Sequence, residues 1–170
     1  MGDLFGLETK LLEQRTKVEL NSKFAENIIR NESEKYTKDL DNLCDNIKSI
    51  IFNDTEELTL VEYEQIAMKL SLLLYDLETV SEYTAVRLSV SKVLEEERYT
   101  QVFLSTKGSG PIGERELITK STIQVESMAT ILSKHIYQII DKKKRCAYEL
   151  LATVKKLISS RISSNDYNNL

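Results

Sequence analysis

The amino-acid sequence predicts an all-α protein built from three long helices. Neither glycine nor proline occurs between Gly6 and Gly108, so the two residue types that interrupt helices most strongly are missing there. Apolar residues in this stretch recur at steps of three and four, which is the period of one helix face. Three of the five glycines and the only proline lie together in residues 107–113, and they predict a turn.

The first helix is expected over residues 8–52, where the helical period is continuous. The pattern fails at residues 53–57, whose Asn, Asp and Thr side chains bond their own backbone and favour caps. Thr59 and Glu62 then have the spacing of a capping box, in which each side chain accepts a bond from the other's backbone amide. The sequence therefore predicts a turn near residues 53–58 and a second helix from residue 59.

The second helix is expected over residues 59–106. Beyond Val86 its pattern is less regular and richer in β-branched residues, and a short strand at 101–106 is the alternative. The charged run at 95–98 and the absence of a period of two favour a helix. The first part resembles a coiled-coil seam, at Ile66, Leu70, Leu73, Leu77, Val80 and Thr84.

The third helix is expected over residues 114–163, after the glycine turn at 107–113. Helices of this length extend about 70 Å, and the short turn should fold the second and third helices into an antiparallel hairpin. Residues 1–170 are thus expected to form one helical domain, similar to a coiled-coil bundle. An a/d register covers the first three heptads of the third helix, at Ile118, Thr122, Val125, Ala129, Leu132, Ile136 and Ile139.

Assembly is expected because the apolar stripes are narrow for helices this long, so that one chain buries little apolar surface. Apolar residues make up 41% of the chain and charged residues 29%, which suits elongated helices with much solvated surface. We expect a homo-oligomer, in which the first helix either packs on its own hairpin or exchanges with a neighbouring subunit.

The sequence gives no sign of export or membrane insertion. No segment approaches the ~18 uninterrupted apolar residues of a membrane span, and the N-terminal residues lack the basic start and apolar run of a secretory signal. Cys44 and Cys146 are far apart and form no CxxC pair, which fits free thiols in a reducing compartment. The expected location is the cytoplasm, or the host cytoplasm if a phage encodes the chain.

Catalytic and metal-binding motifs are missing. His135 is the only histidine, and no cysteine or carboxylate cluster lies at ligand spacing around it. The glycines of residues 107–113 lack the GxxxxGK order of a nucleotide-binding loop. The carboxylates at 95–97 are consecutive and point to different sides of a helix, unlike a paired acid and base. The sequence predicts no enzyme activity, no cofactor and no metal site.

Positive charge is concentrated in the third helix. Residues 1–112 contain 13 basic and 21 acidic side chains, whereas residues 113–170 contain 10 basic and 6 acidic ones. Such an imbalance is typical of complementary packing or of a face that binds a polyanion. The densest basic run, residues 142–145, is a candidate for phosphate contact. The alternative is that these side chains are only hydrated, at a level where the helix bundle loosens. The four residues of this run surround the helix, so at least one must point toward the apolar seam. They are Lys142, Lys143, Lys144 and Arg145.

A second candidate site lies at the tip of the hairpin, where cations and aromatic rings flank the glycine turn. Single-stranded nucleic acid is held by this combination, because cations track phosphates and rings stack on unpaired bases. The alternative is that Tyr99 and Phe103, four residues apart, stack on one helix face. The candidate residues are Arg98, Tyr99, Phe103, Lys107 and Arg115.

The stretch from Arg98 and Tyr99 through Phe103 to Lys107-Gly108-Ser109-Gly110 resembles the phage recombination-mediator proteins of the UvsY type. The resemblance covers about twenty residues, and elsewhere only size and helical character agree. It implies a small helical oligomer that binds single-stranded DNA and helps a RecA-like recombinase displace single-strand-binding protein. It also implies that Arg98 and Lys107 contact phosphates and that Tyr99 or Phe103 lies near bases. The acidic N-terminal extension and Pro111 depart from the pattern.

Two functions remain open at this stage. The first is a non-enzymatic, single-stranded-DNA-binding mediator that loads a recombinase. The second is a helical structural or adaptor protein, for virion assembly or a protein scaffold, with no nucleic-acid role.

Overall fold

The computed structural model describes the backbone of residues 4–53 and 58–168, and the side chains of residues 15, 16, 18–50 and 58–163. This part of the chain contains four helices and no strand. The predicted all-α class is therefore confirmed, and the alternative of a strand at 101–106 is wrong. The helices are α1 (Leu4–Asn53), α2 (Leu60–Ser105), α3 (Ile112–Thr122) and α4 (Gln124–Asn168).

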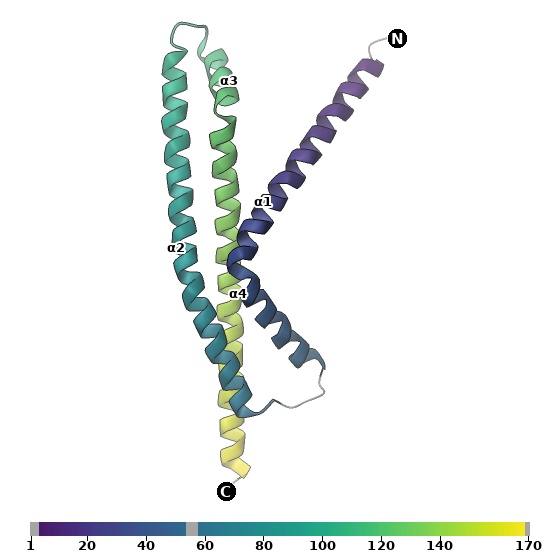
Figure 1. Cartoon of the computed structure of the whole chain (residues 1–170), viewed down its shortest axis with the longest axis vertical. Coiled ribbons are helices and arrows are strands. Elements are labelled where there is room, and N and C mark those ends of the chain that lie inside the picture. Colours follow the sequence, from purple (N-terminus) through teal and green to yellow (C-terminus); the bar gives the residue numbers. More distant parts are fainter. Residues whose placement is uncertain (1–3, 54–57, 169–170) are drawn as a thin grey trace.

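Helices α2 and α4 form an antiparallel hairpin, with α3 and the glycine turn at its tip (Figure 1). Helix α2 begins at the capping box that the sequence predicts. The Thr59 hydroxyl accepts the Glu62 N–H at 3.3 Å, and the Glu62 carboxylate accepts the Thr59 N–H at 2.7 Å. The bond from the Thr59 backbone holds the pKa of Glu62 below its ordinary value. Of the turn predicted at 53–58, residues 54–57 lie outside the described residues.

The third helix is interrupted, which corrects the prediction of one helix over 114–163. Ile123, with φ −95° and ψ 20°, separates α3 from α4. The interruption is slight, because the Ile123 N–H still donates to the Thr119 carbonyl at 3.1 Å. Its cause is a run of hydroxyl side chains that bond to carbonyls three or four residues earlier, which loosens and bends helices. These side chains are Thr119, Ser121 and Thr122.

Helix α1 is bent, and the two arms have different surroundings (Figure 1). The Ser33 hydroxyl donates to the Arg30 carbonyl and the Thr37 hydroxyl to the Ser33 carbonyl, at 3.1 and 3.2 Å, and such bonds bend helices. Beyond them, Leu40 and Ile47 are buried against the hairpin of the same chain. The other arm runs away from the hairpin and exposes the apolar side chains Val18, Leu20 and Phe24.

The main core lies where α1, α2 and α4 meet. We call this part of the hairpin, α2 residues 60–80 with α4 residues 136–162, the proximal half. Apolar residues from all three helices fill its interior, which is the arrangement that the hydrophobic effect favours. They are Leu40, Ile47, Leu70, Leu74, Leu77, Ile136, Ile140, Ala147, Leu151 and Val154.

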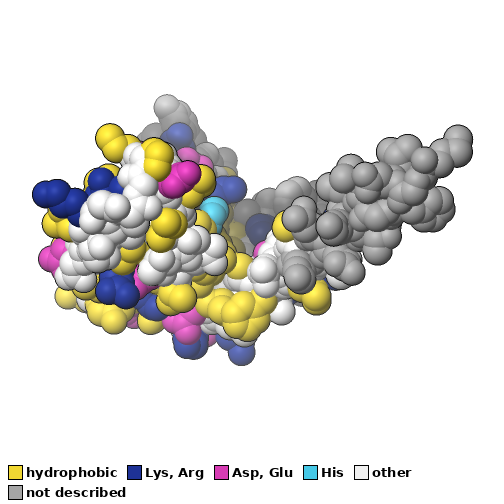
Figure 2. Space-filling view, turned by 90° about the horizontal axis from the view of Figure 1, so that it is seen from above, with side chains coloured by type: hydrophobic (Ala, Val, Ile, Leu, Met, Phe, Trp, Pro, Cys, Tyr) yellow, Lys and Arg dark blue, Asp and Glu magenta, His cyan; other side chains and the backbone are white. Residues whose placement is uncertain are grey.

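The part next to the glycine turn, residues 84–105 with 112–133, is the distal half, and hydroxyl groups occupy much of its helix–helix contact. The Ser91 and Ser133 hydroxyls lie 3.2 Å apart, and the Ser127 hydroxyl donates to the Glu95 carboxylate at 2.6 Å. Hydrophobic side chains instead appear on the outer surface at this end of the molecule (Figure 2).

The predicted a/d register over residues 118–139 is wrong in its distal part. Val125 is 79% exposed, and Ile118, Thr122 and Ala129 are exposed as well. The buried residues of this segment are instead Thr119, Ile123 and Ser133, because the helix turns a largely polar side toward α2.

Candidate nucleic-acid interface

The glycine turn has a defined shape. Gly108 and Gly110 have φ values of +96° and +148°, in the region that glycine adopts without strain. A Cβ atom at Gly110 would lie 2.6 Å from Oε2 of Glu114. The Ser109 N–H donates to the Thr106 carbonyl at 3.1 Å, which closes the turn. The side chains at the tip therefore project from a fixed backbone.

Arg115 is held against the end of α2. Its Nη2 donates to the Phe103 carbonyl at 2.7 Å, and its guanidinium carbon lies 4.2 Å from the centroid of the Phe103 ring. The rings of Tyr99 and Phe103 stack with centroids 6.0 Å apart and planes 9° apart. Three of the residues predicted to contact nucleic acid are therefore engaged with one another.

The two other predicted residues of the tip, Arg98 and Lys107, are exposed. The Arg98 Nε lies 3.7 Å from a carboxylate oxygen of Glu126, across the two helices. The segment from Lys92 to Glu126 carries five basic and six acidic side chains. A polyanion would therefore meet no excess of positive charge at the tip.

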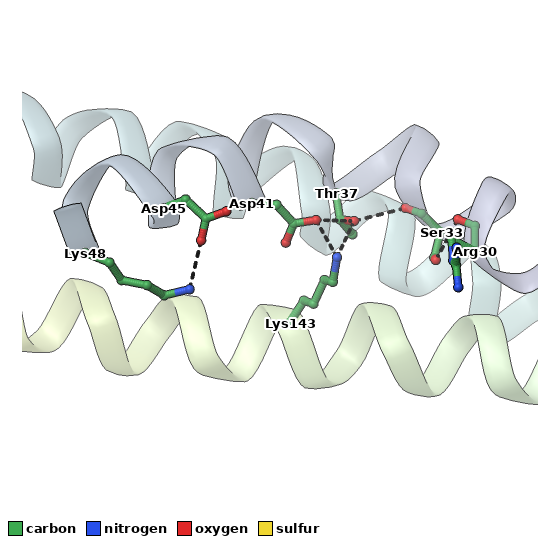
Figure 3. A network of polar contacts seen from close by, with 7 residues as sticks. All are labelled: Arg30, Ser33, Thr37, Asp41, Asp45, Lys48 and Lys143. Atoms are coloured by element: carbon green, nitrogen blue, oxygen red, sulfur yellow. Dashed lines mark hydrogen bonds and ion pairs between the residues drawn. The ribbon is translucent and has the colours of Figure 1, made fainter.

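Lys143, in the basic run of α4, points toward α1 (Figure 3). Its ammonium donates to the Thr37 hydroxyl at 2.9 Å and to the Asp41 carboxylate. Thr37 is fully buried, whereas the Lys143 and Asp41 side chains are 32% and 40% exposed. Lys143 therefore connects α4 to α1 just beyond the bend.

Lys144 points toward α2 instead. Its ammonium donates to the Glu78 carboxylate at 3.0 Å and to the Ser81 hydroxyl at 3.2 Å. Burial is the largest single effect and lowers the pKa of Lys144, but the bond to Glu78 and the charges of Glu78, Asp141 and Tyr137 together leave that pKa above its ordinary value. Hydrogen bonds from Lys144 and Tyr148 lower the pKa of Glu78. The bond between Tyr148 and Glu78 also raises the pKa of Tyr148.

Lys142 and Arg145 lie on the outer side of α4. The Arg145 side chain is 70% exposed and pairs at 2.9 Å with Asp141 of its own helix. Helical spacing places three more exposed lysines on the same outer half of α4, with the acidic Glu149 among them. At 1.5 Å per residue these cations extend over about 33 Å. We call them the α4 basic strip: Lys134, Lys142, Arg145, Lys155 and Lys156.

A groove of about 670 Å³ lies between α1 and α4. Ile29 and Arg30 of α1 and Leu132 and His135 of α4 line it. Among the described residues, no group of three or more His, Cys, Asp or Glu side chains could hold a metal ion. Over the same residues, no helix combines the length and apolar character that crossing a membrane requires.

Comparison with known proteins finds no family model, no curated protein and no solved structure that matches this chain significantly. The class of protein rests on the fold and its surfaces: an all-α hairpin with one basic outer strip.

Proposed function

We propose that this chain is a non-enzymatic accessory protein that binds single-stranded nucleic acid along the α4 basic strip. The observation that carries the proposal is the exposure of Lys134, Lys142, Arg145, Lys155 and Lys156 on one side of a helix. Cations that follow a straight helix for about 33 Å can contact several successive phosphates at once.

The division of the basic run supports this location. Lys143 and Lys144 are occupied by Asp41 and Glu78, so they serve the fold. Lys142 and Arg145 do not reach into either seam and remain accessible to a ligand. At the tip, Arg98 and Lys107 are exposed but stand among carboxylates, so we give them a secondary role.

The choice of a single strand, and of a RecA-like recombinase as protein partner, comes from the resemblance to recombination mediators. The rings that would stack on bases, Tyr99 and Phe103, are stacked on each other. We therefore expect binding through phosphates, with little dependence on base sequence.

Fluorescence anisotropy of a labelled single-stranded oligonucleotide, at ~50 mM salt where phosphate contacts are strong, tests the proposal. The double variant Lys142→Glu/Lys156→Glu should weaken binding at least about tenfold, because two phosphate contacts become repulsive. The slope of log affinity against log salt should also become shallower.

The matched control is Lys23→Glu/Lys38→Glu, which changes the net charge equally at exposed positions of α1. It should leave affinity nearly unchanged. Equal losses in both variants would mean that only net charge matters, and no binding by the unmodified chain would remove the proposal. A duplex of the same sequence tests the preference for single strands, and an added RecA-like recombinase tests the partner.

A structural or adaptor protein is the second candidate, favoured by apolar residues on the outer surface of α3 and α4. Such residues mark surfaces that other proteins cover. Light scattering after size exclusion separates the two candidates. A defined assembly with the same mass with and without oligonucleotide favours this candidate. The exposed residues are Leu117, Ile118, Val125, Met128 and Ile131.

A further inference from the structure

Helix α2 has two apolar faces on opposite sides. One face, with Leu70, Leu74 and Leu77, is buried against the rest of the chain. The other face runs along the outer side of the helix, and each of its nine large apolar side chains is more than half exposed. A helix with apolar residues on both sides is typical of one that packs on both sides. We call the outer set the α2 stripe: Val61, Met68, Leu72, Tyr75, Tyr83, Val86, Val90, Val93 and Leu104.

The α2 stripe has the spacing of a coiled-coil seam. From Val61 to Thr79 its positions alternate at steps of four and three, with Gln65 and Thr79 at two of the steps. One additional step of four leads to Tyr83, and the alternation then continues to Val93. Gln65 and Thr79 are themselves exposed, so no described part of this chain covers them. Over this span of about 48 Å the outer face of α2 could receive one straight helix.

The stripe is also large enough for a stable interface. Nine side chains that each expose on the order of 100 Å² amount to about 900 Å² on one chain. A standard protein–protein interface buries about 800 Å² on each partner.

We propose that α2 of a second copy of this chain covers the α2 stripe, and that the two helices run parallel and in register as a two-stranded coiled coil. In that arrangement each stripe residue meets its own counterpart, so one apolar stripe is complementary to itself. The two α4 helices then lie on the outside of a row of four helices, and both glycine turns lie at one end.

Charges beside the stripe favour the parallel arrangement. In a parallel pair, a flanking residue contacts the residue five positions later on the other helix. Glu64 would therefore meet Lys69 of the second copy, and Glu82 would meet Arg87. An antiparallel pair covering Val61 to Val93 would instead be centred near residue 77 and bring the two copies of Asp76 together, which is repulsive.

This inference does not depend on nucleic-acid binding, because the α4 basic strip and the α2 stripe lie on different helices. Sedimentation equilibrium of the full chain, at roughly 100 µM so that a micromolar complex is populated, tests the pairing. The expected mass is twice the 19.5 kDa of one chain. A monomer at this concentration would overturn the proposal.

Leu72→Glu should raise the dissociation constant by about 100-fold or more, since it puts a charge into the centre of the interface. Leu72 is exposed in the single chain, so the circular dichroism spectrum of the variant should match that of the unmodified chain. The matched control is Val125→Glu, at an exposed apolar position of α4 outside the stripe, which should remain paired. Equal dissociation in both variants, or in neither, contradicts the assignment of the face.

The direction of pairing is tested with Gln65→Cys in a chain that carries Cys44→Ser and Cys146→Ser. Position 65 lies near one end of the stripe, so the two introduced cysteines meet only if the helices are parallel. Thiol–disulfide exchange with a small-molecule disulfide should then form a disulfide bond between the two copies. A paired chain that does not form this link overturns the parallel arrangement.

Discussion

The proximal and distal halves of the hairpin bury different proportions of apolar and polar side chains. In the proximal half, Leu70, Leu74 and Ile140 lie in a closed apolar core with α1. In the distal half, Ser91 meets Ser133 and Ser127 meets Glu95. Val102 and Ile123 are buried there, but many large apolar side chains lie outside. Helix α1 makes the difference, because it packs on the α2–α4 interface of the proximal half. One chain therefore closes the interior of its proximal half with α1, whereas apolar side chains remain exposed on the outer surface of both halves.

The largest difference between the halves should appear in alanine substitutions of apolar residues. Leu74→Ala, in the proximal core, should lower the free energy of unfolding by about 2–5 kcal/mol, because it leaves a cavity. Val125→Ala, at an exposed position of the distal half, should change it by less than about 0.5 kcal/mol. Urea denaturation followed by circular dichroism measures both. Similar losses would contradict the comparison.

The second largest loss of stability should come from breaking the contacts of Lys143, which connect α4 to α1. Lys143→Ala removes the donor to Thr37 and Asp41, and should cost about 1 kcal/mol, since both charged side chains are partly exposed. Limited proteolysis should then cut α1 faster than α4. Lys142→Ala, one residue away and exposed, is the control and should alter neither stability nor cleavage. Equal behaviour of the two variants would remove the role assigned to Lys143.

The polar seam of the distal half can be tested without changing its charge. Ser91→Ala should cost up to about 1 kcal/mol, because the buried Ser133 hydroxyl loses its partner, whereas in Ser133→Ala the Ser91 hydroxyl still donates to the Arg87 carbonyl. Ser91→Ala/Ser133→Ala should recover most of this loss, because no hydroxyl is left unpaired. Thermal unfolding of the unmodified chain, the two single variants and the double variant measures these losses. A double variant that loses the sum of two single losses would show that the hydroxyl pair is not the relevant contact.

The smallest effect should come from the ion pair between Glu78 and Lys144 in the proximal half. Hydrogen bonds from Lys144 and Tyr148 lower the folded-state pKa of Glu78, so its contribution is present above the unfolded pKa of about 4.3 and declines as the pH falls through the lower folded value. The pKa of Lys144 is raised, so its contribution is complete below about pH 10.4 and declines above it. Glu78→Gln should therefore flatten the melting temperature between about pH 5 and 3. Glu34→Gln, at an exposed position, should not.

The sequence predicted the helices and the hairpin well where a single residue type determines whether a helix continues or ends. The missing glycines, the capping box at Thr59 and the glycine turn gave the helices and the hairpin within a few residues at most boundaries. The interruption at Ile123 was not predicted, although its signal is visible as the cluster of Thr119, Ser121 and Thr122. The choice of buried face in the distal half depends on tertiary packing, because both sides of this segment carry residues that a helix interface accepts.

Contacts between distant segments also limited what the sequence could predict about the candidate site. The sequence indicated that at least one cation of residues 142–145 must face a seam, and two of them do, Lys143 and Lys144. Their partners, Asp41 and Glu78, lie about 100 and 66 residues away in the sequence, so spacing within one helix could not identify them. The engagement of Arg115 with Phe103 likewise depends on the turn that brings them together.

Amide hydrogen exchange along the chain, at a dilution where it is monomeric, tests the central contrast most directly. Amides of the proximal half, in residues 66–77 and 136–154, should exchange only through global unfolding. Amides of the distal half, in residues 84–95 and 124–133, should exchange faster through local opening, because one chain buries little apolar surface there. Uniform protection of both halves in the monomer would contradict the account.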